Sequence, residues 1–576
     1  MKKYNRIILF LVALLPFVYL YPYRPYGAWI AETSALVLVS VMFLFSNEEK
    51  STDSFIGPVQ ITFLGLIFSA FLSKIVNSPS YDSILIIYVL YLFIGLFIAH
   101  YIYNLNDKNE VVYLIAKGLF WGGVVQFIFC ISKMSGFFVI YSQWINGLPF
   151  WVPHFNVNRT PNGFMFQRNQ FADYLFMSGA AACYLYAQTE IKKITFIGSI
   201  IAIGLAISLS MSRTALLYIA MGFAVVALLH FKGDDTKKFS KAFLWFLACC
   251  IVFQVLSPYL NKIMVEYFPL LTEGSGLKRL GAGVNDTRWP EWQKAWHTFL
   301  ANPWFGTGVG TYAAASYQLG AQFPYKGGEI VYQLFAHCHN IFLQLLAETG
   351  ILGGISLLFG TIAVVYGIIK NKLDIHAAFV LIALSTMFIH SQLEYPLWYA
   401  SFFILFTILA STVKLDLYSY TSTARSGVKY IFPVFILVAS IYGLYSVVKL
   451  IDLNNRYESE AYSEALVNES VSLGGNLLVE DMADFYTLAM LSLDDRNLDY
   501  KLYLSSKILK FRPHAEMIFR HAIFISYKNR PDEGAAIVKN ILDQYPQFIG
   551  SFRESFASVQ DDPRLDKIKT VLQHKY

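Results

Sequence analysis

The sequence predicts an all-α polytopic membrane protein of about 13 transmembrane helices, with a large extramembrane loop and a C-terminal helical domain. Of its 576 residues, 56% are hydrophobic and only 15% are charged, whereas soluble domains carry about 25% charged residues. Apolar runs long enough to cross a bilayer recur as far as residue 450. The tail, residues 451–576, has a charged helical pattern without such a run.

A membrane span needs about 20 mostly apolar residues. The first run follows Lys2, Lys3 and Arg6 and resembles a signal peptide, but no small-residue cleavage site follows it, so we interpret it as an uncleaved first span. The thirteen predicted spans lie near residues 6–22, 28–46, 57–76, 84–103, 111–135, 170–187, 193–210, 214–231, 241–258, 341–369, 376–392, 398–413 and 430–450.

The basic residues predict the orientation of these spans, because lysine and arginine gather in cytoplasmic loops. With the N-terminus inside, the inner connections are rich in lysine, as at Lys192 and Lys193. The short outer connections hold isolated basic residues such as Arg24, Lys74 and Arg213. This topology predicts three long outer segments, residues 136–169, 259–340 and 451–576.

A short polar segment, His337-Cys338-His339-Asn340, opens the tenth span. Asn340, Gln344 and Glu348 follow at intervals of four and therefore share one helical stripe. Two interpretations stay open for Gln344 and Glu348, a functional one and packing between helices. We interpret His339, which lies at the predicted outer end of the span, as a residue that takes part in the chemistry, because imidazole titrates near neutral pH.

Three arginines reach the predicted outer face from distant parts of the chain. Arg168 opens the sixth span together with Asn169 and Gln170, Arg213 lies in a tight turn, and Arg288 lies in the outer loop. A single arginine could be only a snorkelling anchor. However, guanidinium groups bind phosphate oxygens in bidentate fashion, so the arginines together with His339 predict a site for a lipid-linked phosphate.

Two further outer segments carry patterns of interest. Residues 289–301 place tryptophans on one helical stripe, which predicts a helix on the membrane surface, capped by Asp286 or Thr287. His390 and Glu394 stand four apart, followed by Tyr395, so a carboxylate could orient the imidazole. The alternative for this second segment is a capped helix end with an aromatic belt.

The tail is predicted to be a tetratricopeptide-like (TPR-like) helical domain. Pro513 and Pro546 each follow an Ile-Leu pair and lie 33 residues apart, which is close to the repeat of about 34 residues. Solenoid surfaces of this kind mostly bind peptides or proteins. The alternative is a small helical bundle that only covers the outer face.

Several function classes lack support in the sequence. Four of the five cysteines lie inside apolar runs, and neither a CxxC nor an HExxH motif is present, so we expect no disulfide framework, metal site or cofactor. Gly306-Thr307-Gly308-Val309-Gly310 lacks the Lys-Ser/Thr of a phosphate-binding loop. No basic patch has the pattern of a nucleic-acid groove.

These motifs together resemble the O-antigen ligase / O-oligosaccharyltransferase (Wzy_C) superfamily of bacterial inner membranes, over nearly the whole chain. The tail, the segment that opens at Arg168 and the segment from His390 to Leu397 resemble its pilin-glycosylating, PglL-like branch. The segments that carry the resemblance are Arg168-Asn169-Gln170-Phe171-Ala172, Ser212-Arg213-Thr214, Asp286-Thr287-Arg288, Asn302-Pro303-Trp304-Phe305-Gly306-Thr307-Gly308, His339-Asn340, Glu348-Thr349-Gly350, and His390-Ser391 with Glu394-Tyr395-Pro396-Leu397.

The resemblance implies an enzyme of the periplasmic face, organised as a transmembrane catalytic domain (1–450, with a periplasmic loop at 259–340) and a periplasmic TPR-like domain (451–576). It implies en bloc transfer of a glycan from undecaprenyl diphosphate to a serine or threonine hydroxyl of a periplasmic protein such as pilin, metal-independent and inverting. The implied catalytic residues are His339, Arg288 and Arg213; the implied substrate-binding residues are Arg168, Asn169, Gln170, Asn340, His390, Glu394 and Tyr395.

Other readings of the same chain remain open. The acceptor could be lipid A–core, as for an O-antigen ligase, or another lipid-linked repeat, as for a glycan polymerase. The helical tail favours a protein acceptor over both. A transporter of lipid-linked sugars is the non-enzyme alternative. It predicts a continuous polar path through many spans, whereas the polar groups here cluster on the predicted outer face.

Overall fold

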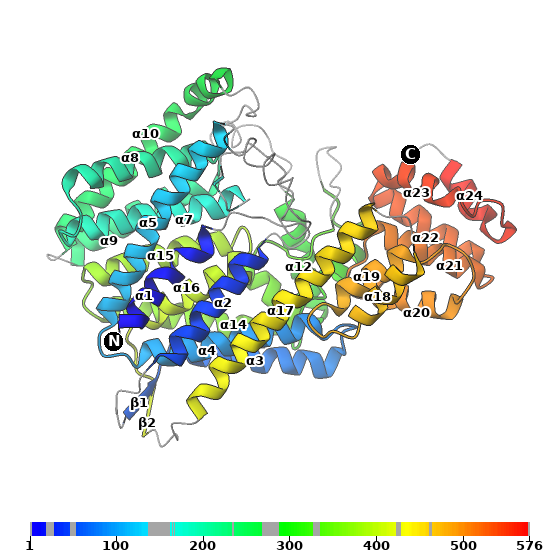
Figure 1. The fold of residues 1–576 in the computed structure, drawn as a ribbon, viewed down its shortest axis with the longest axis horizontal. Helices are drawn as coiled ribbons and strands as arrows, with labels where there is room; N and C mark the ends of the chain where they lie inside the picture. The colour runs from blue at the N-terminus through cyan, green and yellow to red at the C-terminus, as the bar shows by residue number, and fades with distance from the viewer. Residues whose placement is uncertain are drawn as a thin grey trace. The chain divides into compact units, whose positions relative to one another are not determined.

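The protein is an all-α polytopic membrane protein (Figure 1). Within the residues that the structure describes, the only sheet is a two-stranded antiparallel one, β1 (Asp53–Ile56) paired with β2 (Tyr418–Thr421). The chain forms two compact units. The computed structural model describes residues 3–18, 28–46, 53–135, 137, 162–163, 165, 167–232, 236–267, 287–325, 334–421, 428–459 and 463–573.

Unit 1 comprises Met1–Leu64, Leu92–Val284 and Leu358–Leu444. Its central helix, α7, packs against α5, α8, α10 and α15, and its residues from Phe171 to Leu185 are all buried. Small residues permit this close packing. The helices that lie wholly in this unit are α1 (Lys3–Val12), α2 (Trp29–Leu44), α5 (Lys108–Met134), α7 (Arg168–Ala187), α8 (Lys193–Leu209), α9 (Thr214–Lys232), α10 (Lys237–Tyr267), α15 (Ile375–Ser391) and α16 (Ala400–Ser411).

Unit 2 comprises Gly65–Tyr91, Asn285–Leu357 and Tyr445–Tyr576. It contains α12 (Arg288–Ala301) and α13 (Tyr312–Gln318), followed by the helices of the tail. Four helices run from one unit into the other: α3 (Pro58–Asn77), α4 (Ser83–Tyr103), α14 (Ile341–Lys370) and α17 (Val428–Ser459). The tail helices are α18 (Glu464–Leu473), α19 (Glu480–Met490), α20 (Leu498–Leu509), α21 (Ala515–Tyr527), α22 (Pro531–Gln544), α23 (Ile549–Phe556) and α24 (Asp566–Gln573).

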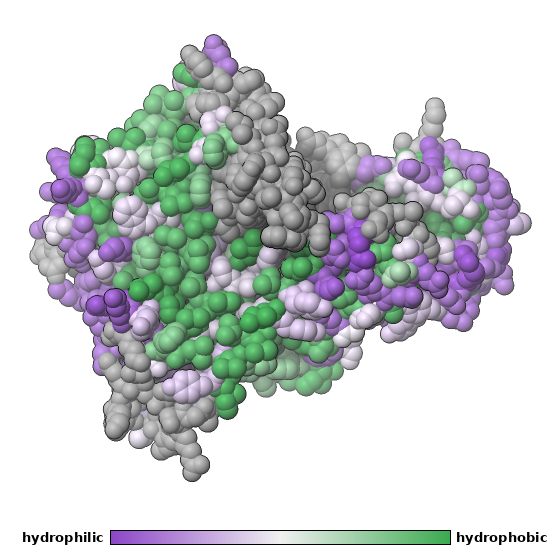
Figure 2. Space-filling view, in the orientation of Figure 1, coloured by the Kyte–Doolittle hydropathy of each residue, from purple (hydrophilic) through white to green (hydrophobic). Residues whose placement is uncertain are grey.

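All thirteen predicted spans fall on described helices, but these helices differ in length. Seven are long and apolar enough to cross a membrane within the described part of the chain, and α2, α8, α15 and α16 are shorter apolar helices. In the run near 6–22, the described residues form α1 and a 3₁₀ turn, Leu15–Phe17, at a proline, and residues 19–22 lie outside the described ranges. Hydrophobic residues cover the surface over helices such as α2 and α4, and hydrophilic ones cover α20–α24 (Figure 2). The number thirteen stays a prediction.

Within unit 2, the tail encloses the turn between α3 and α4. The ring of Tyr81 is 2% exposed and belongs to the hydrophobic core of the tail. Its hydroxyl donates to Asp484 (3.0 Å), and the Lys507 ammonium lies 4.3 Å from its ring centroid. Glu480 of α19 accepts from the backbone N–H groups of Asp82 (3.0 Å) and Ser83 (3.4 Å). A tail carboxylate therefore caps the N-terminus of α4, where unpaired N–H groups and the helix dipole favour a negative charge.

Candidate functional sites

In unit 1, hydrogen bonds join three of the sequence segments that were predicted to be functional. Asn169 donates to Glu394 (Nδ2 to Oε1, 3.0 Å) and accepts from the Ser212 hydroxyl (2.7 Å). The Ser212 hydroxyl also lies 2.7 Å from that of Thr214. The beginning of α7, the turn between α8 and α9, and the turn after α15 therefore meet at Asn169. Gln170 lies in the first turn of α7, where its N–H donates to the side chain of Gln167 (2.6 Å).

Arg168 and Arg213 flank this polar cluster in the sequence, each next to one of its members. The turn that carries Arg213 is tight because Met211 adopts a left-handed conformation (φ 55°) and Ser212 N–H donates to the Ser210 hydroxyl (3.3 Å). Both arginines are half-buried. Among the residues that the structure describes, neither guanidinium group donates a hydrogen bond. Two guanidinium groups that donate to none of the described residues can bind an anion.

The carboxylate beside His390 is Asp173, so the expected partner, Glu394, was wrong. His390 Nδ1 lies 2.7 Å from Asp173 Oδ2, and both side chains are fully buried. The helix α15 ends at Ser391, before it reaches Glu394, and Glu394 bonds to Asn169 instead. Asp173 was missed because it lies in the middle of an apolar run. Its signal was that it is the single carboxylate in that run, four residues after Asn169.

Tyr395 follows Glu394 in the turn between α15 and the 3₁₀ helix Pro396–Trp398. Its ring stacks on that of Tyr399, with centroids 6.0 Å apart. The proline at the start of the 3₁₀ helix prevents α15 from continuing, since proline lacks the N–H that a helix interior needs. The turn therefore holds Glu394 and Tyr395 next to each other. It is both a helix end with aromatic neighbours and a part of the polar cluster around Asn169.

In unit 2, His339 lies in a strained turn just before α14. Its φ angle is 61°, in the left-handed region that non-glycine residues rarely adopt. Its N–H donates to His337 Nδ1 (2.8 Å), and the N–H of Cys338 donates to Gln344 Oε1 (2.9 Å). The Asn340 side chain accepts from Leu343 N–H (3.0 Å), which caps α14. Three side chains therefore fix the backbone around His339.

Gln344 and Glu348 connect α14 to neighbouring backbone, as the packing interpretation predicts. Glu348 Oε1 accepts from Tyr312 N–H (3.2 Å), and the Glu348 carbonyl accepts from Gly308 N–H (2.9 Å). A Cβ at Gly306 would lie 2.3 Å from the Glu348 carbonyl carbon. The glycine-rich segment therefore packs its backbone directly onto α14, which explains the glycines without a phosphate-binding role.

Arg288 is the first residue of α12, the helix predicted from the tryptophan stripe. The helix presents Trp289 and Trp296 to the surface, 60% and 43% exposed, whereas Glu291 and Lys294 are buried. Thr287 is its N-cap residue but makes no side-chain capping bond, and Asp286 lies outside the described residues. The burial of α12 is thus inverted, with polar groups inside and aromatic rings outside.

Two stretches of the chain match known sequence families. Residues 198–359 match the family described as O-Antigen ligase, and residues 378–555 match the family described as Virulence factor membrane-bound polymerase, C-terminal. The chain belongs to the O-antigen ligase (Wzy_C) superfamily. No curated protein matches the chain significantly.

The O-antigen ligase match contains all three predicted catalytic residues. It spans α8 to α14 and so includes Arg213, Arg288 and His339. The polymerase match includes His390 and Glu394 and extends through most of the tail. The Arg168 segment lies before both matches. Members of the superfamily are membrane-bound glycan ligases and polymerases, and this supports a glycosyltransferase-like activity for the chain.

No group of three or more histidine, cysteine, aspartate and glutamate side chains in the described residues could hold a metal ion. The described cysteines, Cys130, Cys183, Cys249, Cys250 and Cys338, are all free thiols.

Proposed function

We propose that the chain is an O-oligosaccharyltransferase of the inner membrane. It transfers a preassembled glycan from undecaprenyl diphosphate to a serine or threonine hydroxyl of a periplasmic protein such as pilin. The observation that carries the proposal is the pair Arg168 and Arg213, whose guanidinium groups are half-buried and donate no hydrogen bond among the described residues. A diphosphate has the charge and the acceptor oxygens that such groups bind.

In the proposed reaction, the acceptor hydroxyl oxygen attacks the anomeric carbon and the bond from that carbon to the diphosphate breaks. His339 takes the hydroxyl proton as general base, which typically contributes about 100- to 10,000-fold. Arg213 and Arg288 stabilise the negative charge that develops on the leaving diphosphate. A single displacement inverts the anomeric centre, and undecaprenyl diphosphate is the second product.

The other polar residues are proposed to bind the donor. Arg168, Asn169 and Gln170 lie together in the first turn of α7, and Asn169 shares its amide between Glu394 and Ser212. We assign Tyr395 and His390 to the same donor-binding role. For Asn340 the proposal adds substrate binding to the capping bond that its side-chain oxygen accepts from Leu343 N–H.

We assign recognition of the protein acceptor to the tail. Its consecutive helices pack in order, α18 on α19, α20 on α21 and α21 on α22, which is the arrangement that lets helical repeats present an extended binding surface. The proposed division is a catalytic transmembrane domain, residues 1–450, and a periplasmic acceptor domain, residues 451–576.

A second candidate function is glycan polymerisation. The match of residues 378–555 to the C-terminal region of a membrane-bound polymerase family favours it. The donor would be the same, but the acceptor would be another lipid-linked repeat. Transfer to lipid A–core is the third possible outcome for the same donor chemistry.

One reconstitution assay separates these functions. Purified protein in detergent is incubated with an undecaprenyl-diphosphate glycan and, in parallel reactions, with candidate pilin, with lipid A–core, or with donor alone. We expect the intact mass of pilin to rise by the mass of one glycan. Longer lipid-linked chains from donor alone would show a polymerase, and modified lipid A–core would show a ligase. Loss of the product in Arg213→Ala links the activity to the site.

A further inference from the structure

Beneath the surface of the outer loop lies a charged network that none of the proposed roles uses. The Glu291 carboxylate is fully buried and accepts four hydrogen bonds: from the Lys294 ammonium (2.7 Å), the Tyr312 hydroxyl (2.7 Å), the Tyr325 hydroxyl (2.5 Å) and the Ser316 hydroxyl (3.0 Å). Lys294 is 2% exposed. All these residues lie in unit 2.

The network is electrically balanced and well satisfied. The Lys294 ammonium also donates to the Tyr325 hydroxyl (3.1 Å) and lies 4.5 Å from the centroid of that ring. Burial, with the Glu291 charge as second cause, raises the pKa of Tyr325 and of Tyr312, so both hydroxyls stay protonated donors. A buried ion pair with its other lone pairs satisfied specifies one arrangement of the groups around it.

Two paths lead from this network to the turn that carries His339. Tyr312 bonds to Glu291 through its hydroxyl and to Glu348 through its N–H (3.2 Å), and its ring packs with Cys338 and Ala347 in one small core cluster. On the other side, the Tyr325 ring lies 6.0 Å from that of Phe335, which in turn lies 5.6 Å from the His339 imidazole.

The backbone of His339 needs such support. A left-handed non-glycine residue is unfavourable and persists only where the surroundings determine it. Cys338, directly before it, is completely buried, and its thiol contacts the Asn340 carbonyl (3.2 Å). The turn is therefore held in place by the contacts of the buried Cys338 and by the contact between Phe335 and the His339 ring.

We propose that Glu291 and Lys294, with the hydroxyls of Tyr312, Ser316 and Tyr325, are positioning residues that hold His339 in its strained conformation. They act through Cys338 and Phe335 and do not touch substrate. The consequence for the reaction rests on the proposed function of His339, but the structural claim does not.

The test uses Cys338 as a reporter beside His339. In the full chain with the other four cysteines replaced by alanine, a maleimide reaches Cys338 only when the turn opens locally. Burial also raises the pKa of this thiol, which keeps it unreactive in the closed state. Glu291→Gln leaves Lys294 buried without its counter-charge, so we expect Cys338 labelling to accelerate about 10- to 100-fold.

Three further variants sharpen the test. Glu533→Gln is the matched control, because Glu533 forms an i,i+3 pair with Arg530 that is exposed; its labelling should equal that of the parent. In Glu291→Gln/Lys294→Met both charges are gone, so labelling should be slower than in Glu291→Gln. Tyr325→Phe removes one hydroxyl and serves if Glu291→Gln does not fold; it should give a smaller acceleration.

Parent-like labelling in both Glu291→Gln and Tyr325→Phe would overturn the inference, as would equal acceleration in Glu533→Gln. The transfer assay gives a second readout: positioning predicts that kcat falls while KM for the donor stays near the parental value. If the parent shows no transfer with any acceptor, the proposed function fails, but accelerated labelling still supports the positioning network. If transfer occurs and labelling does not change, the network fails and the proposed function stands.

Discussion

His339 is the proposed general base, and its backbone has an unusual, left-handed conformation. We predict that His339→Ala reduces transfer by about 100- to 10,000-fold, the loss typical of a missing general base. Donor binding should survive, because the arginines are unchanged. The measurement is the initial rate of glycan transfer with saturating donor, together with donor affinity. Near-parental transfer by His339→Ala would exclude the assignment and make His390 the next candidate.

A substitution at Arg288 separates the effect of the guanidinium group's shape on activity from the effect of its charge. We predict that Arg288→Lys folds normally and loses most of its activity, since lysine keeps the charge and loses the bidentate fork. Arg6→Lys, at an ion pair with Glu110 outside the tail, is the matched control and should transfer at the parental rate. If Arg288→Lys also does so, Arg288 is only a charged anchor.

Some residues of the candidate site could be identified from the sequence, and others could not. His339, Arg213 and Asn169 could be selected because they are polar at the ends of apolar runs. Asp173 and Glu291 could not, because their roles depend on partners 217 and 21 residues away, His390 and the Tyr312 hydroxyl. A buried carboxylate is recognised by its partner, and the partner is defined only by the fold.

Helix α12 shows the same limit at the scale of an element. Its existence followed from the tryptophan spacing over residues 289–301. The sequence also predicted that this helix lies on the membrane surface, but not that one face of it holds a buried charged pair. Hydrophobic spans were predictable because each needs only a long apolar run. The ion pair on the buried face of α12 was not, because its burial depends on α13 and on the segment that contains Tyr325.

The exposed rings of α12 lead to a prediction about lipid contact. Tryptophan favours the bilayer interface, so we expect brominated phospholipids in nanodiscs to quench Trp296 fluorescence. The quenched component should decrease in Trp296→Phe, although exposed tryptophans such as Trp289 still contribute to it. It should stay unchanged in Trp292→Phe, because the Trp292 indole nitrogen is buried. If both variants keep the full quenched component, α12 does not lie on the bilayer.

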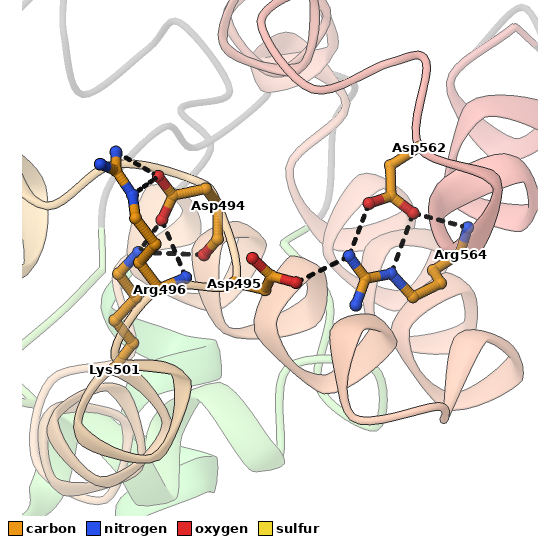
Figure 3. Close-up of polar contacts among 6 residues, drawn as sticks. All are labelled: Asp494, Asp495, Arg496, Lys501, Asp562 and Arg564. Atoms are coloured by element: carbon orange, nitrogen blue, oxygen red, sulfur yellow. Dashed lines mark hydrogen bonds and ion pairs between the residues drawn. The ribbon is translucent and has the colours of Figure 1, made fainter.

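Ion pairs in the tail lead to a prediction about pH. Asp494 bonds to Arg496 (2.6 Å) and Lys501 (2.7 Å), and Arg564 joins Asp562 (2.7 Å) to Asp495 (2.9 Å) (Figure 3). Partial burial by itself would raise the pKa of Asp494, but the bonds from Arg496 and Lys501 outweigh it and hold the pKa below its usual range.

Because this pKa is lower in the folded state, the stabilisation is complete above the unfolded value of about 4 and is lost as pH falls below it. Asp494→Asn should therefore lower the free energy of unfolding of the tail at pH 7. The difference in this free energy between the variant and the parent should shrink towards pH 3. Hydrogen exchange of tail peptides in the full chain measures this. Asp561→Asn, at an exposed position, is the control. A difference that does not change with pH would contradict the ion-pair explanation.

For the whole molecule, the central prediction is its orientation. The lysine asymmetry predicts a cytoplasmic N-terminus and a periplasmic tail. Reporter fusions at residues 235 and 460 should give cytoplasmic and periplasmic signals respectively. The reverse pattern would place His339 and the arginines on the cytosolic side and remove the proposed donor chemistry.

The enclosure of Tyr81 by the tail also has a consequence for biosynthesis. Tyr81 and Asp484, which hydrogen bond to each other, are 403 residues apart. At about 5–20 residues per second, the ribosome adds the second of these residues roughly 20–80 s after the first. During that interval the turn between α3 and α4 has no carboxylate cap and no hydrophobic cover. The nascent chain therefore passes through a state that a chaperone or a protease can recognise, and a C-terminal truncation makes that state permanent.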